Sequence, residues 1–306
     1  MQTAKLRIGT RGSRLARIQA QEAKDRLVAA HGLDADSVEV HVISTSGDRI
    51  QDRPLSELGG KGLFTKEIEE ALLERKIDIA VHSMKDMPAT LPDGLVISCL
   101  LPREDARDAF ISPVARSIRT LPKGARLGSS SVRRAAQVRR LRSDIEVVNF
   151  RGNVETRLRK LGERQADATL LACAGLNRLG LQAHVTSIVA MEDMLPAVAQ
   201  GAIGIEARAD DARIDQLLVA IGDQDTAITI ACERAFLAVL EGSCRMPIAG
   251  HAVLDRENIS FRGEVLTPDG RKVFAAARQG SAADAAALGR EAGLEVKRAA
   301  AGHLEG

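Results

Sequence analysis

The sequence predicts an α/β protein with two similar α/β domains joined by a hinge and a small α+β domain at the C-terminal end. Short apolar stretches alternate with helical spacing along the first part of the chain, and this alternation restarts once. After Asp223 it gives way to an apolar helix, three strands and an alanine-rich helix. A length of 306 residues favours two or three domains. We assign residues 1–100 with 200–219 to domain 1, 101–199 to domain 2 and 222–306 to domain 3.

The first domain is predicted from strands that alternate with helices. Ser13 is a suitable cap for a helix whose small apolar residues recur at helical spacing, and a second helix follows Thr65, with acidic Glu67 near its start. The strands that we expect in this domain span residues 6–8, 38–43, 77–82 and 94–99.

The second and third domains follow from the same signals. Helices are expected after Ser131 and Asn153, and the strands of the second domain span residues 109–111, 126–128, 145–148 and 168–172. The run 195–206, in which one proline and two glycines interrupt apolar residues, is interpreted as a hinge. In the third domain a helix over 227–240 precedes strands over 248–254, 259–265 and 272–277, and a helix ends the chain.

The run from Ile77 to Pro88 is the most informative stretch, because an apolar strand ends directly in polar and charged groups. Ligands bind at such strand ends in open α/β sheets. Met87 precedes a proline and is therefore pushed toward an extended conformation, so Lys85 and Asp86 are expected on a stiff turn rather than a helix. Two interpretations stay open at this point: a ligand site, or a solvated turn in which Lys85 and Asp86 pair.

Positive charge is concentrated in one segment. Residues 126–164 hold eleven basic and four acidic residues, a local charge of +7 in a chain with a net charge of +2. This distribution indicates an anionic partner. Nucleic acid is a poor candidate because the chain has no Trp or Tyr and only six Phe on which bases could stack. Small carboxylates or phosphates fit better.

Three basic groups of residues lie where helices are expected to begin: residues 10–13, 128–134 and 151–157, with Arg178 as a possible fourth. A helix N-terminus with a guanidinium is suited to binding a carboxylate. Any one of them alone is more simply a capped helix with a solvated arginine. Three together at strand ends favour an anion site.

Cys244 lies in a constrained loop between Ser243 and Pro247, beside Arg245, which favours the thiolate. An incidental exposed thiol is the alternative. The other three cysteines, at 99, 173 and 232, lie in apolar segments and are expected to be inert. No histidine or cysteine spacing indicates a metal, no glycine motif indicates a nucleotide, and residues 44–62 are expected to form a mobile polar lid. We expect reduced thiols and a cytoplasmic protein without a signal peptide or membrane span.

Together these segments closely resemble the porphobilinogen deaminase (hydroxymethylbilane synthase) family, whose members are transferases. The matching motifs are the Thr10-Arg-Gly-Ser13 start, Gly59-Gly-Lys-Gly-Leu-Phe64, His82-Ser-Met-Lys-Asp86, Ser129-Ser-Ser-Val-Arg-Arg134, Arg151-Gly-Asn153 and Leu240-Glu-Gly-Ser-Cys-Arg-Met-Pro-Ile248. The resemblance implies a monomer whose dipyrromethane cofactor is held by a thioether to Cys244. It also implies that four porphobilinogen molecules are deaminated and joined head to tail, as steps of tetrapyrrole, porphyrin and heme biosynthesis.

The resemblance also implies roles for single residues. Asp86 would be catalytic, and Lys61 and Phe64 would belong to the lid. Besides Cys244, the cofactor would be bound by Ser83, Lys85, Asp86, Ser129, Ser131, Arg133, Arg134 and Arg151. The substrate would be bound by Arg11, Ser13, Arg151, Arg157, Arg178 and Gln200.

One position departs from the family pattern, because Ala199 stands where the family usually has glycine. If that position requires a positive φ, alanine is strained there. A different class of function also fits the fold: two hinged α/β domains are typical of periplasmic-binding-protein-like folds, so a non-enzymatic module that binds a small polycarboxylate or oxyanion is the alternative. Cys244 discriminates between them, since a pure binding protein has no use for a constrained thiol in a third domain.

Overall fold

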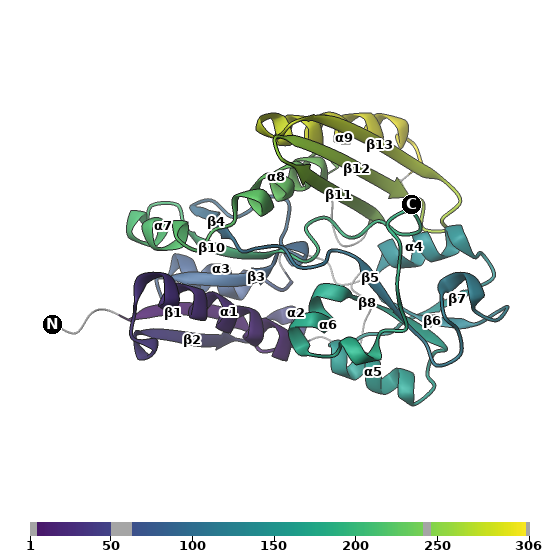
Figure 1. Ribbon diagram of the computed structural model, residues 1–306, viewed down its shortest axis with the longest axis horizontal. Helices are drawn as coiled ribbons and strands as arrows, with labels where there is room; N and C mark the ends of the chain where they lie inside the picture. The colour runs from purple at the N-terminus through teal and green to yellow at the C-terminus, as the bar shows by residue number, and fades with distance from the viewer. Residues whose placement is uncertain (1–4, 50–62, 241–245, 304–306) are drawn as a thin grey trace. The chain divides into compact units, whose positions relative to one another are not determined.

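The computed structural model describes residues 5–49, 63–240 and 246–303 (Figure 1). The predicted cofactor cysteine Cys244 and the lid residue Lys61 lie outside these ranges. The described residues form two compact units: residues 5–49, 63–103 and 202–227 make unit 1, and residues 104–201, 228–240 and 246–303 make unit 2. Unit 2 contains two of the three sheets, and the division into three domains stays a prediction.

Unit 1 is a five-stranded sheet in the order β2-β1-β3-β10-β4. Strands β1 (Leu6–Arg11), β2 (Val38–Ile43) and β3 (Ile79–Ser83) run parallel, and β10 (Ile203–Arg208) is antiparallel both to β3 and to β4 (Leu95–Leu100). Helices α1 (Arg14–His31) and α7 (Ala212–Val219) pack on one face through residues such as Leu27 and Leu218. Helix α3 (Lys66–Leu73) packs on the sheet through Ile68, Leu72 and Ala80.

The first sheet of unit 2 repeats this arrangement in the order β7-β6-β8-β5-β9. Its strands are β5 (Asp108–Ile111), β6 (Arg126–Gly128), β7 (Glu146–Val148), β8 (Ala168–Ala172) and β9 (Ser187–Ile188). As in unit 1, three strands are parallel and the fourth in the order is antiparallel. Helix α4 (Val132–Leu141) contributes to one apolar cluster, and α5 (Val154–Gly162) with α6 (Cys173–Leu179) contributes to another.

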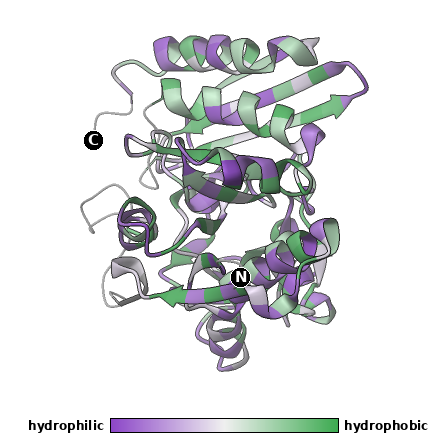
Figure 2. Ribbon diagram, turned by 90° about the vertical axis from the view of Figure 1, so that its left-hand side faces the viewer, coloured by the Kyte–Doolittle hydropathy of each residue, from purple (hydrophilic) through white to green (hydrophobic). Residues whose placement is uncertain are grey.

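The second sheet of unit 2 is antiparallel, in the order β11 (Ile248–Asp255), β12 (Asn258–Leu266) and β13 (Val273–Ser281). Helices α8 (Gln224–Val239) and α9 (Ala285–Ala299) approach closely because α9 has glycine at 289 and 293, where a Cβ atom would lie 2.0 Å from the Cys232 carbonyl oxygen and 2.8 Å from the Val239 Cβ. Figure 2 shows hydrophobic and hydrophilic residues interspersed along the helices, as expected for helices that cover a sheet on one side.

These elements confirm the predicted fold class of repeated α/β domains with a small α+β domain. The predicted helix caps are present: Ser13 accepts from the Ala16 N–H at 3.2 Å, Ser131 from the Arg134 N–H at 3.4 Å and Asn153 from the Thr156 N–H at 2.8 Å. Within the described ranges, no helix is both long and apolar enough to cross a membrane.

Two local predictions are incomplete. The run 195–206 crosses the boundary between the two units at Gly201 and Ala202, but its last residues belong to β10, which begins at Ile203 and pairs along β3, so the hinge stays a prediction. Its Gly204 lets β10 lie against Met84, whose Sδ would be 2.0 Å from a Cβ atom there. The polar segment 44–62 is also not a plain loop where it is described, because Ser46–Arg49 form the short helix α2. The remainder of that predicted lid up to Gly62 lies outside the described residues.

Ala199 has φ 61°, so the one departure from the family pattern places an alanine in the left-handed region. Its N–H donates to the buried Glu233 carboxylate at 2.6 Å, and the same carboxylate accepts from the Ala252 N–H at 2.9 Å. Gly201 follows with φ +93°, and a Cβ atom there would lie 2.3 Å from the Glu104 carbonyl oxygen. The segment 195–201 is therefore tightly specified rather than a loose linker.

Candidate functional site

The end of β3 forms the candidate site of unit 1. Residues Met84–Asp86 make a single 3₁₀ turn after the strand, so Lys85 and Asp86 do sit on a short turn as predicted. Ser83 exchanges two hydrogen bonds with the Gln19 side chain, at 2.9 and 3.0 Å, and the Met84 N–H donates to the Ala202 carbonyl oxygen at 3.0 Å. These contacts attach the turn to α1 and to the residue before β10.

Asp86 is oriented by Arg11, which comes from the end of β1. The Arg11 Nη1 lies 3.5 Å from the Asp86 Oδ2, and the Asp86 side chain is 35% exposed. The Arg11 guanidinium also stacks over the Phe64 ring, 4.1 Å from the centroid. The structure thus brings together Arg11, Phe64, Ser83 and Asp86 from three separate segments of unit 1, while Lys85 is exposed on the same turn as Asp86.

The candidate site of unit 2 is organised by Asp108, a residue that the sequence analysis missed. Its carboxylate accepts from the Arg133 Nη2 at 2.7 Å, the Arg134 Nη2 at 2.7 Å and the Gln200 Nε2 at 2.9 Å. The remaining Nη atoms of the two arginines donate to the carbonyl oxygens of Leu195, at 2.6 Å, and Leu170, at 2.9 Å. Three predicted ligand-binding residues therefore share one buried carboxylate.

This cluster carries more positive than negative charge. Burial acts to raise the pKa of Asp108, but the charges of Arg133 and Arg134 and the hydrogen bonds from Arg134 and Gln200 hold that pKa well below its ordinary value. Both arginines are only 5% exposed. The next carboxylate, Glu264, lies 3.4 Å from Arg140. Two guanidiniums against one carboxylate at the N-terminus of α4 favour an added anion.

One donor of the cluster is unsatisfied within the described part of the chain. The Nε of Arg134 is buried and has no hydrogen-bond partner among the described residues. Buried donors in folded proteins are nearly always satisfied, because an unpaired one costs about 1–3 kcal/mol. An acceptor atom on a bound anion would satisfy it.

The other predicted residues of unit 2 lie near the starts of α4 and α5, except Arg178, which lies in the last turn of α6. Ser131 caps α4, and the Ser129 hydroxyl accepts from the Ser131 N–H at 3.2 Å. The Arg157 Nε donates to the Gly152 carbonyl oxygen at 2.9 Å, and the Arg178 Nη1 donates to the Gly201 carbonyl oxygen at 3.2 Å. Arg151 is half-buried in the turn before α5. Each of these two hydrogen bonds to a carbonyl oxygen orients the guanidinium of Arg157 or Arg178. A guanidinium has five N–H donors in total.

The three described cysteines are confirmed as inert. Cys99, Cys173 and Cys232 are buried free thiols, and burial raises their pKa to about 11, about 12 and about 12. At neutral pH they hold almost no thiolate, which is the reactive form. A thiol that forms a covalent bond must therefore be sought outside this set, and Cys244 is the remaining cysteine.

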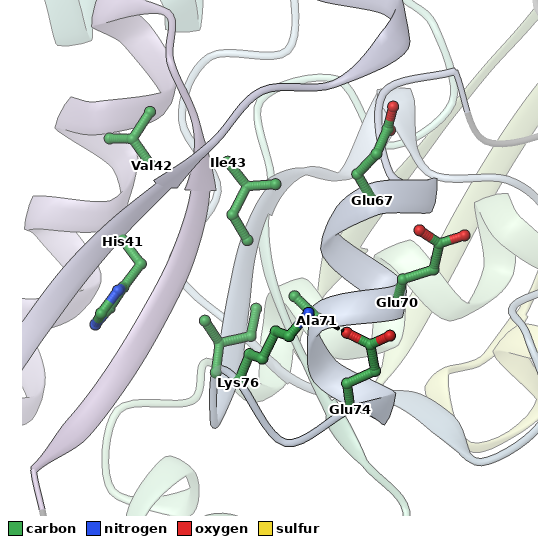
Figure 3. Close-up of a pocket in the computed structure, with 9 residues that line it drawn as sticks. His41, Val42, Ile43, Glu67, Glu70, Ala71, Glu74 and Lys76 are labelled. Atoms are coloured by element: carbon green, nitrogen blue, oxygen red, sulfur yellow. Dashed lines mark ion pairs between the residues drawn. The ribbon is translucent and has the colours of Figure 1, made fainter.

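A separate hollow of about 420 Å³ lies between β2 and α3 and contains none of the predicted site residues (Figure 3). Its wall includes His41, Glu67, Glu70 and Glu74, the last paired with Lys76. In the part of the chain that the structure describes, no three His, Cys, Asp or Glu side chains are placed to hold a metal ion.

Comparison with protein families gives two matches that together cover nearly the whole chain. Residues 6–216 match the model described as porphobilinogen deaminase, dipyromethane cofactor binding domain. Residues 227–298 match the porphobilinogen deaminase C-terminal domain. The chain belongs to the porphobilinogen deaminase family.

Individual relatives agree with this membership. The chain is 59% identical over 292 residues to a porphobilinogen deaminase of Paracoccus denitrificans (strain Pd 1222), covering 95% of this chain and 93% of the relative. It is 56% identical over 293 residues to a porphobilinogen deaminase of Nitrobacter hamburgensis, covering 96% of this chain and 93% of the relative. The solved structure of an ABC-transporter periplasmic substrate-binding protein from Coxiella burnetii is 15% identical to this chain, with a TM-score of 0.42. The match covers 71% of this chain and 91% of that one, and it supports no conclusion about function.

The residues present fit the cofactor that the family carries. Dipyrromethane bears carboxylate side chains, and the Asp108 cluster offers spare positive charge, a helix N-terminus and the unpartnered Nε of Arg134. The Asp108 cluster lies within residues 6–216, the segment matched to the cofactor binding domain.

We predict that Asp108→Asn lowers the free energy of unfolding by about 3–5 kcal/mol near neutral pH, because it leaves two buried guanidiniums without their anion. Asp193→Asn is the matched control, since Asp193 pairs with the exposed Arg119 and should cost no more than about 1 kcal/mol. The folded-state pKa of Asp108 is depressed, so its stabilisation is present above the ordinary value of 3.8 and is lost as the pH falls below it. Chemical denaturation as a function of pH measures this, and equal losses in the two variants would contradict the assignment.

Proposed function

We propose that this protein is a hydroxymethylbilane-forming porphobilinogen deaminase. It removes ammonia from four porphobilinogen molecules and joins them head to tail on a dipyrromethane primer. The observation that carries the proposal is the buried Arg133–Arg134–Asp108 cluster with its spare positive charge, in a chain that belongs to this family over nearly its whole length.

The cofactor is proposed to be held by Cys244 through a thioether and by the residues at the start of α4. Ser129, Ser131, Arg133 and Arg134 offer hydroxyl, N–H and guanidinium donors to its carboxylates, with Ser83, Lys85, Asp86 and Arg151 completing the proposed set. When bound, dipyrromethane supplies a covalent primer to which the first substrate is joined. Because Asp108 fixes both guanidiniums in advance, little side-chain entropy is lost when a carboxylate binds them.

Asp86 is the proposed catalytic group. Loss of ammonia from porphobilinogen leaves an electron-poor carbon, and a fixed carboxylate beside it stabilises the positive charge that develops. Asp86 fits this role because its turn is attached to Gln19 and to the residue before β10, and its carboxylate is oriented by Arg11. Its partial exposure leaves it accessible to a substrate.

The arginines outside the Asp108 cluster are proposed to bind the growing product. Each added pyrrole brings an acetate and a propionate, so the number of carboxylates grows with every step. Guanidiniums are the matching receptors because each grips a carboxylate with two parallel hydrogen bonds. The proposed arginines are Arg11, Arg151, Arg157 and Arg178, joined by Ser13 and by Gln200 of the Asp108 cluster, with Lys61 and Phe64 on the lid.

The alternative, a non-enzymatic module for a small polycarboxylate, is not favoured, because both matching family models belong to the deaminase. The partner that we propose is the small molecule porphobilinogen, acted on by a monomer in the cytoplasm.

We predict that protein made in a host that synthesises porphobilinogen is heavier than its sequence by two pyrrole units, and that Cys244→Ser lacks this adduct. Cys99→Ser is the control, because burial makes that thiol unreactive and its loss should leave the adduct in place. Intact-protein mass spectrometry measures both. Active protein with the bare mass of the chain would contradict the proposed function.

We predict that Asp86→Asn lowers kcat by about 10²–10³-fold, or about 3–4 kcal/mol of transition-state stabilisation, while the adduct and the fold persist. Asparagine keeps the size and polarity of the side chain but not its charge. The exposed Asp93→Asn serves as control and should turn over normally. The assignment fails if a folded, cofactor-loaded Asp86→Asn enzyme turns over at a near-normal rate.

A further inference from the structure

The face of the unit 1 sheet that packs against α3 carries an unusual number of charged side chains. Along β3, Asp78, Ala80 and His82 share this face by alternation. On β10, Glu206 pairs with Ala80 and Gly204 with His82, so Glu206 and Arg208 lie on the same face. Arg11 joins them from β1, because Gly9 pairs with Ala80.

Most of these charges have a partner of opposite sign. Asp78 bonds to Arg7 at 2.9 Å and lies 3.8 Å from Arg208, which also pairs with Asp211 at 2.8 Å. The Arg11 guanidinium lies 3.5 Å from Asp86. The remaining groups on this face are His82 and Glu206, which contact each other, and α3 adds the buried Glu69.

These three side chains form a buried cluster. The His82 Nε2 lies 3.0 Å from the Glu206 Oε2, and the two side chains are 3% and 0% exposed. Glu69 is also buried. The second oxygen of Glu206 and the Oε1 of Glu69 are shielded from solvent and have no hydrogen-bond partner within the described ranges.

Two buried carboxylates and one imidazole carry a charge of −2 when all three are deprotonated, which costs several kcal/mol per unpaired ion. Burial raises the pKa of Glu69; the hydroxyl of Thr65 and the imidazole of His82 lower it, while the charges of Glu206 and the exposed Glu70 raise it further. The net direction is upward. Glu69 therefore keeps its proton to a higher pH than an ordinary glutamate does.

We propose that His82, Glu206 and Glu69 form a buried proton-holding cluster that positions the catalytic turn Ser83–Asp86. In it, Glu69 keeps its proton to a higher pH than an ordinary glutamate does, and the His82–Glu206 side-chain pair adds to the β3–β10 ladder, in which Ser83 pairs with Ile203 and His82 with Gly204. His82 directly precedes the turn, whose Met84 N–H donates to the Ala202 carbonyl oxygen. The positioning role, but not the proton-holding role, rests on the function proposed for Asp86.

The proton-holding role is tested without activity by Glu69→Gln, an isostere of the neutral acid, with Glu70→Gln on the same helix as control. The folded-state pKa of Glu69 is raised above its ordinary value of 4.5. Its contribution to the free energy of unfolding is therefore fully present below pH 4.5 and is lost as the pH rises through the raised pKa. Glu69→Gln should therefore become more stable relative to the natural chain as the pH rises above 4.5. Infrared spectra recorded as the pH rises above 4.5 should show a protonated carboxyl band that persists beyond the titration of ordinary glutamates and that this variant alone lacks. Parallel pH curves for the two variants, or an unchanged band, would overturn the proposal.

The positioning role is tested in the cofactor-loaded enzyme by His82→Gln against His82→Leu. The amide nitrogen of glutamine stands close to the place of Nε2 and can donate to Glu206, whereas leucine cannot. We expect His82→Leu to have at least a tenfold lower kcat than His82→Gln, with little difference in KM. Equal kcat values in the two variants would overturn the positioning role. If His82→Leu does not fold, the same comparison is made between His82→Gln and Glu206→Leu.

Discussion

The carboxylate of Asp108 is the interaction on which the candidate site of unit 2 depends. It is fully enclosed and accepts hydrogen bonds from Arg133, Arg134 and Gln200, so it joins β5, α4 and the segment 195–201 at one point. Buried guanidiniums are tolerated only with an anion in contact. The carboxylate therefore both permits the two arginines to be buried and fixes where they point, yet one carboxylate cannot neutralise both. We propose that the remaining positive charge makes the cluster a receptor for a polycarboxylate.

Unit 1 shares the helix caps of unit 2 but differs in the charge of the groups at its strand ends. In both α/β sheets, a parallel strand is followed within a few residues by a serine that caps the next helix. Ser13 follows β1 and caps α1, and Ser131 follows β6 and caps α4. In unit 1 the nearby strand β3 ends in the turn with Asp86, so this unit presents a partly exposed carboxylate paired with one arginine. The repeated topology thus supplies a negative group in unit 1 and positive groups in unit 2, the two kinds of charge that the proposed reaction requires.

Much of this could be predicted from the sequence, because the signals were local. The capping residues Ser13, Ser131 and Asn153 predicted where their helices begin. Pro88 predicted the turn at Asp86, and apolar flanking residues predicted which cysteines are buried. Contacts over long sequence separations left no such signal. Asp108 begins a short strand without any motif, and its partners lie 25, 26 and 92 positions away. Strand β10 was hidden because glycine at 204 suggested a hinge, whereas it makes room for the Met84 side chain. The burial of Arg133 and Arg134 was equally unexpected, since arginines at helix starts are usually solvated.

We propose that the geometry of Arg134, and not its charge alone, binds the cofactor. Arg134→Lys keeps the charge but loses both the planar fork held by Asp108 and the unpartnered Nε. The most direct measurement is the fraction of purified protein that carries the two-pyrrole adduct, determined by intact mass in Arg134→Lys and in Arg139→Lys, whose arginine is exposed and bonds the Pro268 carbonyl oxygen. We expect folded Arg134→Lys protein to be mostly without adduct and Arg139→Lys to be fully loaded. Full loading of Arg134→Lys would contradict the account.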